Sequence, residues 1–258
     1  MLRTSALRAR RDRRPVALAS MALAASAAAA TGAGLLAGTA GAAAATASGA
    51  ASAVVAATRS AILSQSAVRV TSTARSTKTD KVTERAVFDA GRRSSMQRYA
   101  TTSPEASVAI LVTPSDVFFS GDRSGLTTLF AMPASDATKV GTRWVDITSH
   151  EAQYKDFSSA VLSSLPHVFL PGTAAKNLRL TTTTSHGARI HVLSWTATGT
   201  TGTDQYRLWV SATGRSLPLQ EVQLQGTTRQ LSVFGHWNEH LAVARPKRVV
   251  AFSSLLGG

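Results

Sequence analysis

The chain has 258 residues, 28 Lys and Arg against 14 Asp and Glu, a formal net charge of +14, and no Cys. The length suits one large domain or two small ones. The absence of Cys excludes disulfides and a cysteine-linked lipid anchor, so the fold must depend on a hydrophobic core. The positive charge favours anionic partners, but the basic residues are scattered singly, which also fits an ordinary soluble surface.

Residues 1–45 have the layout of a secretory signal peptide. Arginines are frequent between Arg3 and Arg14, an Ala/Gly/Leu run follows, and A-x-A cleavage sites include Ala43–Ala45. The apolar run is also long enough to span a bilayer, so a retained anchor is the alternative. Its Ala and Gly content makes insertion weak. We therefore expect Sec export to the cell envelope or the medium, because the arginine pairs lack the twin-arginine consensus.

The next part of the chain predicts one helix and then a run of strands. Residues 49–66 are Ala-rich, with apolar side chains at helical spacing. Alternating apolar and polar residues then predict strands, and a short helix or loop over 126–132 interrupts them. The expected strands cover residues 68–74, 82–90, 96–101, 107–112, 116–120 and 141–147.

A capping box predicts a second helix over residues 151–165. Thr148 precedes Glu151 by three residues, which is the spacing that lets the two residues satisfy each other's backbone groups. An apolar face follows at Tyr154, Phe157, Val161 and Leu165. Pro166 is expected to end this helix.

The last third of the chain predicts a closing sheet. Four strands are expected between residues 188 and 243. A strand from residue 178 is a further candidate, and the total is therefore ten or eleven. A twisted open sheet of that size tends to curl. Some strands are apolar on both faces: Leu193 and Trp195 alternate with Ile190 and Val192. The surplus apolar surface indicates either a bound ligand or aromatic side chains that cap a sheet edge.

Motifs for chemistry are absent from the sequence. His236 and His240 flank a Trp-Asn-Glu segment, but strand geometry would place their rings about 13 Å apart. Residues 121–125 carry Ser at the wrong position for a nucleophile elbow. Phosphate-binding and dinucleotide fingerprints do not occur. We therefore expect no catalysis, no metal and no cofactor, and the export signal argues against nucleic acid as a partner.

The order of these elements resembles the LolA/LppX-like superfamily, in particular its LppX- and LprG-related secreted or lipoprotein members from actinobacteria. The matching pieces are Val68–Ala74, Gly141–Ile147, Tyr206–Val210 with the Gly214–Pro218 corner, and the last strand through Phe234, Trp237 and Asn238. The resemblance implies an α+β fold in which a curled antiparallel half-barrel wraps around helices. We assign residues 46–246 to this domain and 247–258 to a disordered tail. The chain departs from those relatives in lacking a lipobox Cys.

The function implied by the resemblance is a monomeric lipid-binding carrier or sensor that holds acyl chains between sheet and helices. Basic residues such as Arg143 and Arg207 would meet an anionic headgroup, and an anionic membrane surface is a further candidate partner. The alternatives are a protein-interaction module of the RseB N-terminal type and a structural envelope protein. The expected cavity residues are Phe118, Phe119, Leu129, Phe130, Met132, Tyr154, Phe157, Val161 and Trp195.

Overall fold

The computed structural model describes residues 41–151, 153–199 and 202–255. The predicted signal peptide therefore lies almost entirely outside the described residues. Within these residues one long helix, α3, precedes the sheet, and the other helices are short. The helical elements are α3 (Gly41–Ser64), α4 (Arg123–Thr128), α5 (Ala134–Val140), α6 (Tyr154–Ser158), η1 (Leu162–Ser164), α7 (Leu165–Phe169) and η2 (Phe252–Leu255).

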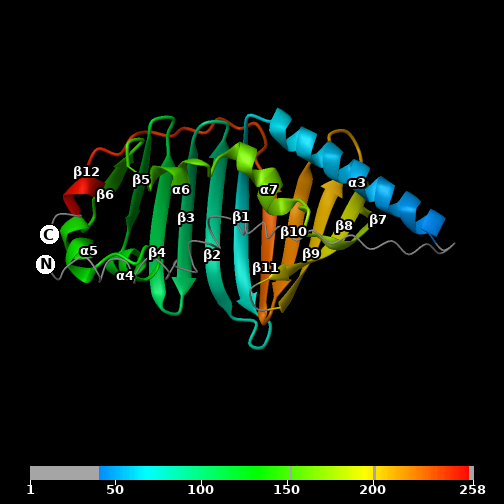
Figure 1. Ribbon diagram of the computed structural model, residues 1–258, viewed down its shortest axis with the longest axis horizontal. Helices are drawn as coiled ribbons and strands as arrows, with labels where there is room; N and C mark the ends of the chain where they lie inside the picture. The colour runs from blue at the N-terminus through cyan, green and yellow to red at the C-terminus, as the bar shows by residue number, and fades with distance from the viewer. Residues whose placement is uncertain (1–40, 152, 200–201, 256–258) are drawn as a thin grey trace, which may run out of the picture.

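All described strands join a single open sheet in the order β12-β6-β5-β4-β3-β2-β1-β11-β10-β9-β8-β7 (Figure 1). Neighbouring strands are antiparallel except for β12 and β6, which are parallel. The strands are β1 (Ala67–Ser76), β2 (Val82–Gly91), β3 (Ser95–Thr102), β4 (Glu105–Val112), β5 (Asp116–Gly121), β6 (Trp144–Thr148), β7 (Lys176–Ser185), β8 (Ala188–Gly199), β9 (Gly202–Ser211), β10 (Pro218–Gln225), β11 (Thr228–Gly235) and β12 (Val249–Ala251).

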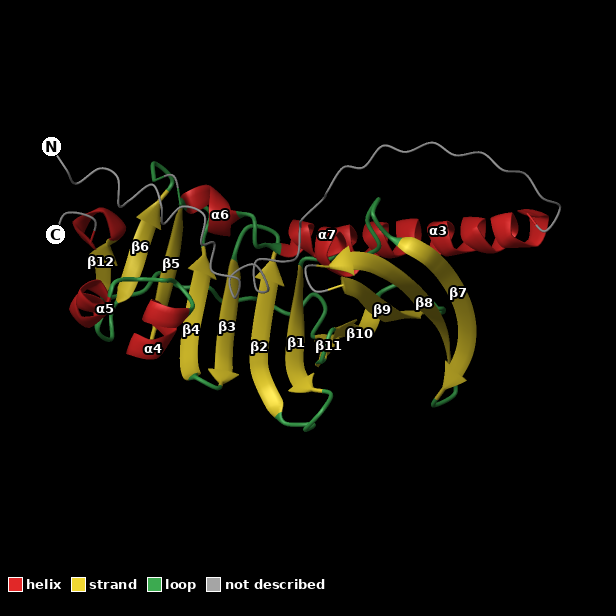
Figure 2. Cartoon of the chain, turned by 60° about the horizontal axis from the view of Figure 1, so that its bottom comes forward, coloured by secondary structure: helices red, strands yellow, loops and turns green. Residues whose placement is uncertain are grey.

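The chain builds this sheet as two meanders that meet in its centre. Strands β1 to β6 run from the middle to one edge, and the connection through α6 and α7 then crosses to the other edge. Strands β7 to β11 return to the middle, where β11 pairs with β1. Figure 2 shows β7, β8 and β9 curving round on the same side as α3. The predicted curled antiparallel half-barrel is confirmed as a large open sheet, which has 12 strands in the described residues where ten or eleven were expected.

The pleat separates an inner face, covered by the helices, from an outer face. Leu193 and Trp195 of β8 and Leu208 of β9 point inward and are buried, whereas Arg207 and Trp209 of β9 point outward. The inner core has one large cluster under α3 and α7 and another under α4 to α6. These clusters account for the alternation that identified the strands in the sequence.

The predicted helix over 151–165 is wrong. Only half of the capping box forms: the Thr148 backbone N–H donates to the Glu151 carboxylate at 2.7 Å, but the Glu151 N–H donates to the Thr148 carbonyl and closes a turn. Helix α6 ends at Ser158, and Val161 then has extended backbone angles. Pro166 lies in the first turn of α7, where a backbone N–H would have no acceptor within the helix, so its absence costs no hydrogen bond. It therefore helps to start a helix instead of ending one.

The disordered tail expected at 247–258 is also corrected by the structure, which describes this segment as far as residue 255. Residues Val249–Ala251 form β12 against β6, and Leu255 of η2 is 7% exposed in the inner core. The segment before β12 crosses the outer face: the Arg245 guanidinium lies 5.5 Å from the Phe118 ring centre and donates to Asp146 at 2.9 Å. The apolar residues Val250, Phe252 and Leu255 are the sequence signal for this packing.

Candidate ligand-binding groove

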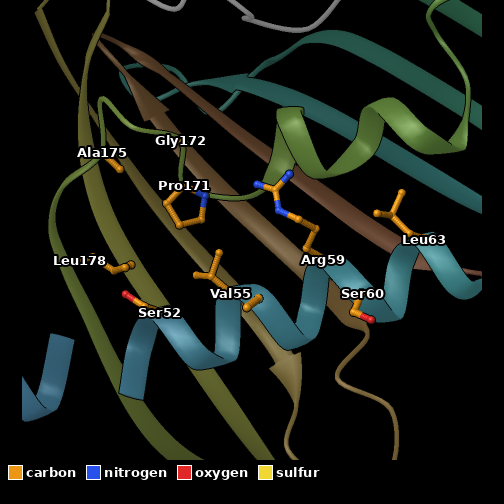
Figure 3. A pocket seen from close by; sticks show the side chains of 10 residues that line it. Ser52, Val55, Arg59, Ser60, Leu63, Pro171, Gly172, Ala175 and Leu178 are labelled. Carbon is orange, nitrogen blue, oxygen red and sulfur yellow. The ribbon is translucent and has the colours of Figure 1, made fainter. Parts of the chain in front are cut away.

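An open groove of about 580 Å³ lies between α3 and the segment that leads from α7 into β7 (Figure 3). Its volume is within the range of about 300–1,000 Å³ that is usual for small-molecule sites. The wall and floor are mainly aliphatic, and a single charged residue, Arg59, takes part. The lining residues are Ser52, Val55, Ala56, Arg59, Ser60, Leu63, Pro171, Gly172, Ala175 and Leu178.

The α3 side of the groove exists because small residues repeat along the helix. Ser52, Ala56 and Ser60 are four residues apart and therefore share one face of the helix. Their short side chains leave space, while Val55 on the adjacent flank contributes apolar surface and points toward Pro171 in Figure 3. The helix forms readily because Ala has the highest intrinsic helix propensity. The groove is thus a consequence of the spacing of small residues in an Ala-rich helix.

The position of α3 is set by a polar cluster at its C-terminal end. The side chain of the buried Gln65 accepts from Asn238 Nδ2 at 2.7 Å and from Arg215 Nη1 at 3.2 Å. The Gln65 carbonyl oxygen accepts from Arg92 Nε at 3.0 Å. Ile62 is fully buried one turn earlier. These contacts connect the helix to the turn after β2, the turn before β10 and the segment after β11.

Arg59 is the only charged residue among those described that lines the groove. In Figure 3 its side chain extends from α3 toward Pro171 and Gly172 on the opposite wall. Within the described part of the chain, no carboxylate lies within ion-pair distance of its guanidinium. A guanidinium of this kind can pair with a carboxylate or phosphate of a ligand. The groove therefore combines aliphatic walls with one anion-binding group.

The inner face of β9 and β10 carries buried acidic and phenolic groups. Tyr206 stacks on Trp195 with ring centres 5.1 Å apart, and its hydroxyl is 3.4 Å from an Asp204 carboxylate oxygen. Burial raises the pKa of Tyr206 to about 12 and also raises the pKa of Asp204. Gln223 donates to the Tyr206 hydroxyl at 3.1 Å. Hydrogen bonds join these groups into a polar strip within the apolar face.

Seven of the nine predicted cavity residues come together under α4 and α6. Phe119 and Phe130 have ring centres 4.5 Å apart, and Phe130 and Phe157 are 6.2 Å apart. They pack directly against one another, and none of them lines the groove. The seven are Phe119, Leu129, Phe130, Met132, Tyr154, Phe157 and Val161.

The other two predicted residues lie elsewhere. Phe118 is fully buried on the outer face beneath Arg245, since adjacent residues of a strand point to opposite faces. Trp195 belongs to the cluster under α3. Of the two arginines expected at the rim, Arg207 lies on the outer face, and Arg143 donates to carbonyl groups at the end of α5. The groove itself was not predicted, although the small-residue spacing of α3 is visible in the sequence.

Two further observations limit the chemistry of the described residues. They contain no group of three or more His, Asp or Glu side chains placed to hold a metal ion. His236 instead pairs with Glu239, with 2.8 Å between the ring nitrogen and the carboxylate. Among the helices of the same residues, none is long and apolar enough to cross a membrane.

Comparison with known proteins identifies the type of fold. No family model matches the chain, and no curated protein matches it either. The solved structure of LprF from Mycobacterium bovis is similar with a TM-score of 0.51 and 12% identity, over 77% of this chain and 97% of that chain. The chain therefore has a LolA/LppX-like fold of the LprF type.

Two other solved structures are more distant. The lipoprotein LppX from Mycobacterium tuberculosis has a TM-score of 0.47 and 13% identity, over 76% of this chain and 99% of that chain. The MucA/MucB complex from Pseudomonas aeruginosa has a TM-score of 0.36 and 12% identity, over 81% of this chain and 61% of that chain. Both likenesses are too low to support an argument about function.

Proposed function

We propose that this protein is an exported carrier or sensor that binds an acyl lipid in the groove beside α3, without catalysis. The observation that carries the proposal is the pairing of aliphatic walls, from Val55, Ala175 and Leu178, with the single cation Arg59. Burial of an acyl chain contributes roughly 25 cal/mol per Å² of apolar area. The order of elements along the sequence, which resembles LppX- and LprG-related proteins, is what suggests this class of ligand.

The headgroup and the acyl chain have distinct places in this proposal. The guanidinium of Arg59 meets a carboxylate or phosphate at the open side, and the chain extends along Val55 and Leu178. The packed aromatic residues around Phe130 provide a second apolar region, which a ligand reaches only if α4 and α6 separate from the sheet. The groove needs no such movement, and we therefore assign it the ligand.

Native mass spectrometry of the protein purified from its own host tests the proposal. We expect near-stoichiometric acyl lipid, released by organic extraction and identified by tandem mass spectrometry. A protein that is free of lipid, and that takes up no fatty acid or phospholipid when incubated with either, would contradict the carrier function. Co-purification of a stoichiometric protein without lipid would instead support the RseB-type interaction module. A monomer that binds neither lipid nor a partner protein would support the structural envelope role.

A further inference from the structure

We infer that the outer face of strands β7 to β11 is a docking surface for an anionic lipid bilayer. This inference concerns a surface separate from the groove and does not depend on the identity of any cargo. We call this surface the outer patch and define it by Arg179, Arg207, Arg229, Trp209, Val222 and Leu231. These residues border a shallow hollow of about 640 Å³.

The strand register brings these residues onto one face. Arg179 pairs with Ser194, Ser194 with Arg207, Arg207 with Val222, and Val222 with Leu231, so the row crosses five strands. Residues paired in this way project from the same side of a sheet. The row therefore places two arginines and two aliphatic side chains side by side across β7, β8, β9, β10 and β11.

The acidic groups of these five strands are kept off the outer face, although Arg189 of β8 shares the inner face with Leu193. The outer face carries Arg179, Arg207 and Arg229, all exposed. The only two carboxylates in the described parts of these strands, Asp204 and Glu221, are buried on the inner face. None of the three arginines makes an ion pair with a described residue. The outer patch is thus uniformly cationic.

The patch is also apolar, which an ordinary solvated basic surface would not be. The Arg207 guanidinium lies 5.9 Å from the Trp209 ring centre. Val222 and Leu231 are only half-buried, and Val233 in the neighbouring row is 46% exposed. On the other half of the outer face the chain covers its own apolar residues, since Phe118 lies beneath Arg245. The outer patch has no such cover from the described residues.

An anionic bilayer fits this combination of groups. Trp and the stems of Arg occupy the boundary between headgroups and acyl chains, and guanidinium groups bind phosphate through paired hydrogen bonds. Each basic residue near such a surface strengthens binding by about a factor of five, so three arginines give a reversible attachment. An acidic peptide is less well matched, since it would pair with the arginines but would offer no apolar layer to Trp209, Val222 and Leu231.

The test is flotation of the full chain with vesicles. The Arg179→Gln, Arg207→Gln, Arg229→Gln triple variant is compared with an Arg93→Gln, Arg123→Gln, Arg248→Gln triple variant, which removes equal charge from exposed positions elsewhere. Vesicles contain phosphatidylcholine alone or with an equal amount of phosphatidylglycerol. The difference between the two variants removes the contribution of the arginines in the first 14 residues, which both retain.

We expect the patch variant to lose about 100-fold in partitioning to the anionic vesicles, and the matched variant to lose much less. Brominated lipid should quench Trp fluorescence in the wild type, and the Trp209→Phe variant should lose most of this quenching. Equal losses in the two triple variants would overturn the inference, because net charge alone would explain them. Binding of a soluble acidic peptide but not of vesicles would also overturn it and would assign the patch to a protein partner.

Thermal unfolding and lipid content serve as controls for this experiment. Exposed Arg→Gln changes should leave the unfolding temperature nearly unchanged. The lipid bound in the groove should be the same in both triple variants, since no patch arginine lines the groove. Loss of vesicle binding with normal cargo therefore identifies a failure of docking, and normal vesicle binding without cargo identifies a failure of the proposed carrier function.

Discussion

Glu221 of β10 faces Leu208 of β9 across the antiparallel ladder, and both side chains are buried on the inner face of the sheet. The Oε1 atom of Glu221 has no hydrogen-bond partner among the described residues. Burial raises the pKa of Glu221 from its ordinary value of 4.5 to about 8. A protonated carboxyl group therefore lies in the core at neutral pH.

This arrangement predicts that stability falls as the pH rises. The unfolded chain releases the Glu221 proton near pH 4.5 and the folded chain near pH 8, so the folded state binds more protons between these values. The free energy of unfolding is then highest below pH 4.5 for this group and decreases up to about pH 8. The total change is roughly 2–5 kcal/mol. Urea unfolding at several pH values between 5 and 8 measures it.

The Glu221→Gln variant is the control for this pH dependence. It keeps the shape and removes the titration, so most of the slope should disappear, although a part remains because burial also raises the pKa of Asp204. Parallel stability curves for the wild type and the variant would show that Glu221 is ionised in the folded state.

A bulky side chain at Ala56 should block the groove. Ala56 lines the groove and Ala57, also exposed, lies on another face of α3. We expect Ala56→Phe to reduce bound lipid severalfold, because the ring occupies the space, and Ala57→Phe to leave it unchanged. Native mass spectrometry gives the occupancy. Equal lipid occupancy in both variants would contradict binding in the groove and would favour the aromatic cluster around Phe130 as the site.

Removal of the Arg59 charge should change headgroup preference more than total lipid binding. We expect Arg59→Gln to weaken the binding of anionic lipids about fivefold, which is typical of a partly exposed ion pair. The binding of neutral lipids should not change. Arg93→Gln, at an exposed turn, is the matched control. Competition between a fatty acid and its methyl ester measures the preference. If the variant binds the fatty acid and its methyl ester in the same ratio as the wild type, Arg59 does not contact the headgroup.

The end of the chain should contribute measurably to stability. Leu255 is 7% exposed in the inner core, so Leu255→Ala should cost about 2–4 kcal/mol. Val249 of β12 is 39% exposed, and Val249→Ala should cost less than about 1 kcal/mol. Urea unfolding compares the two. If both variants lose equally little stability, the result would support the disordered tail predicted from the sequence.

Strands such as β1 and β9 could be predicted from the sequence because alternation reports burial on one face, whereas β5 and β6 are buried on both faces and show an apolar run instead. Alternation does not say which face is inner, and Phe118 was therefore grouped with Phe119 although the two point to opposite sides. The prediction of one helix over 151–165 was wrong because the same apolar spacing also fits two short helical segments on either side of an extended Val161. The groove depends on where α3 lies against residues 171–178, a long-range relationship that local patterns do not contain.

The pairing of β1 with β11 joins residues that lie far apart in the chain, as Ser72 and Ser232 show with 2.8 Å between their hydroxyl oxygens. Each meander is held by local hairpins, whereas this central ladder needs the closure of a very long loop. We expect each meander to form early and the ladder to form late in folding. Until it closes, both strands present free edges, and a half from one copy can pair with a half from another. The middle of the sheet is thus the place where exchange between two molecules would begin.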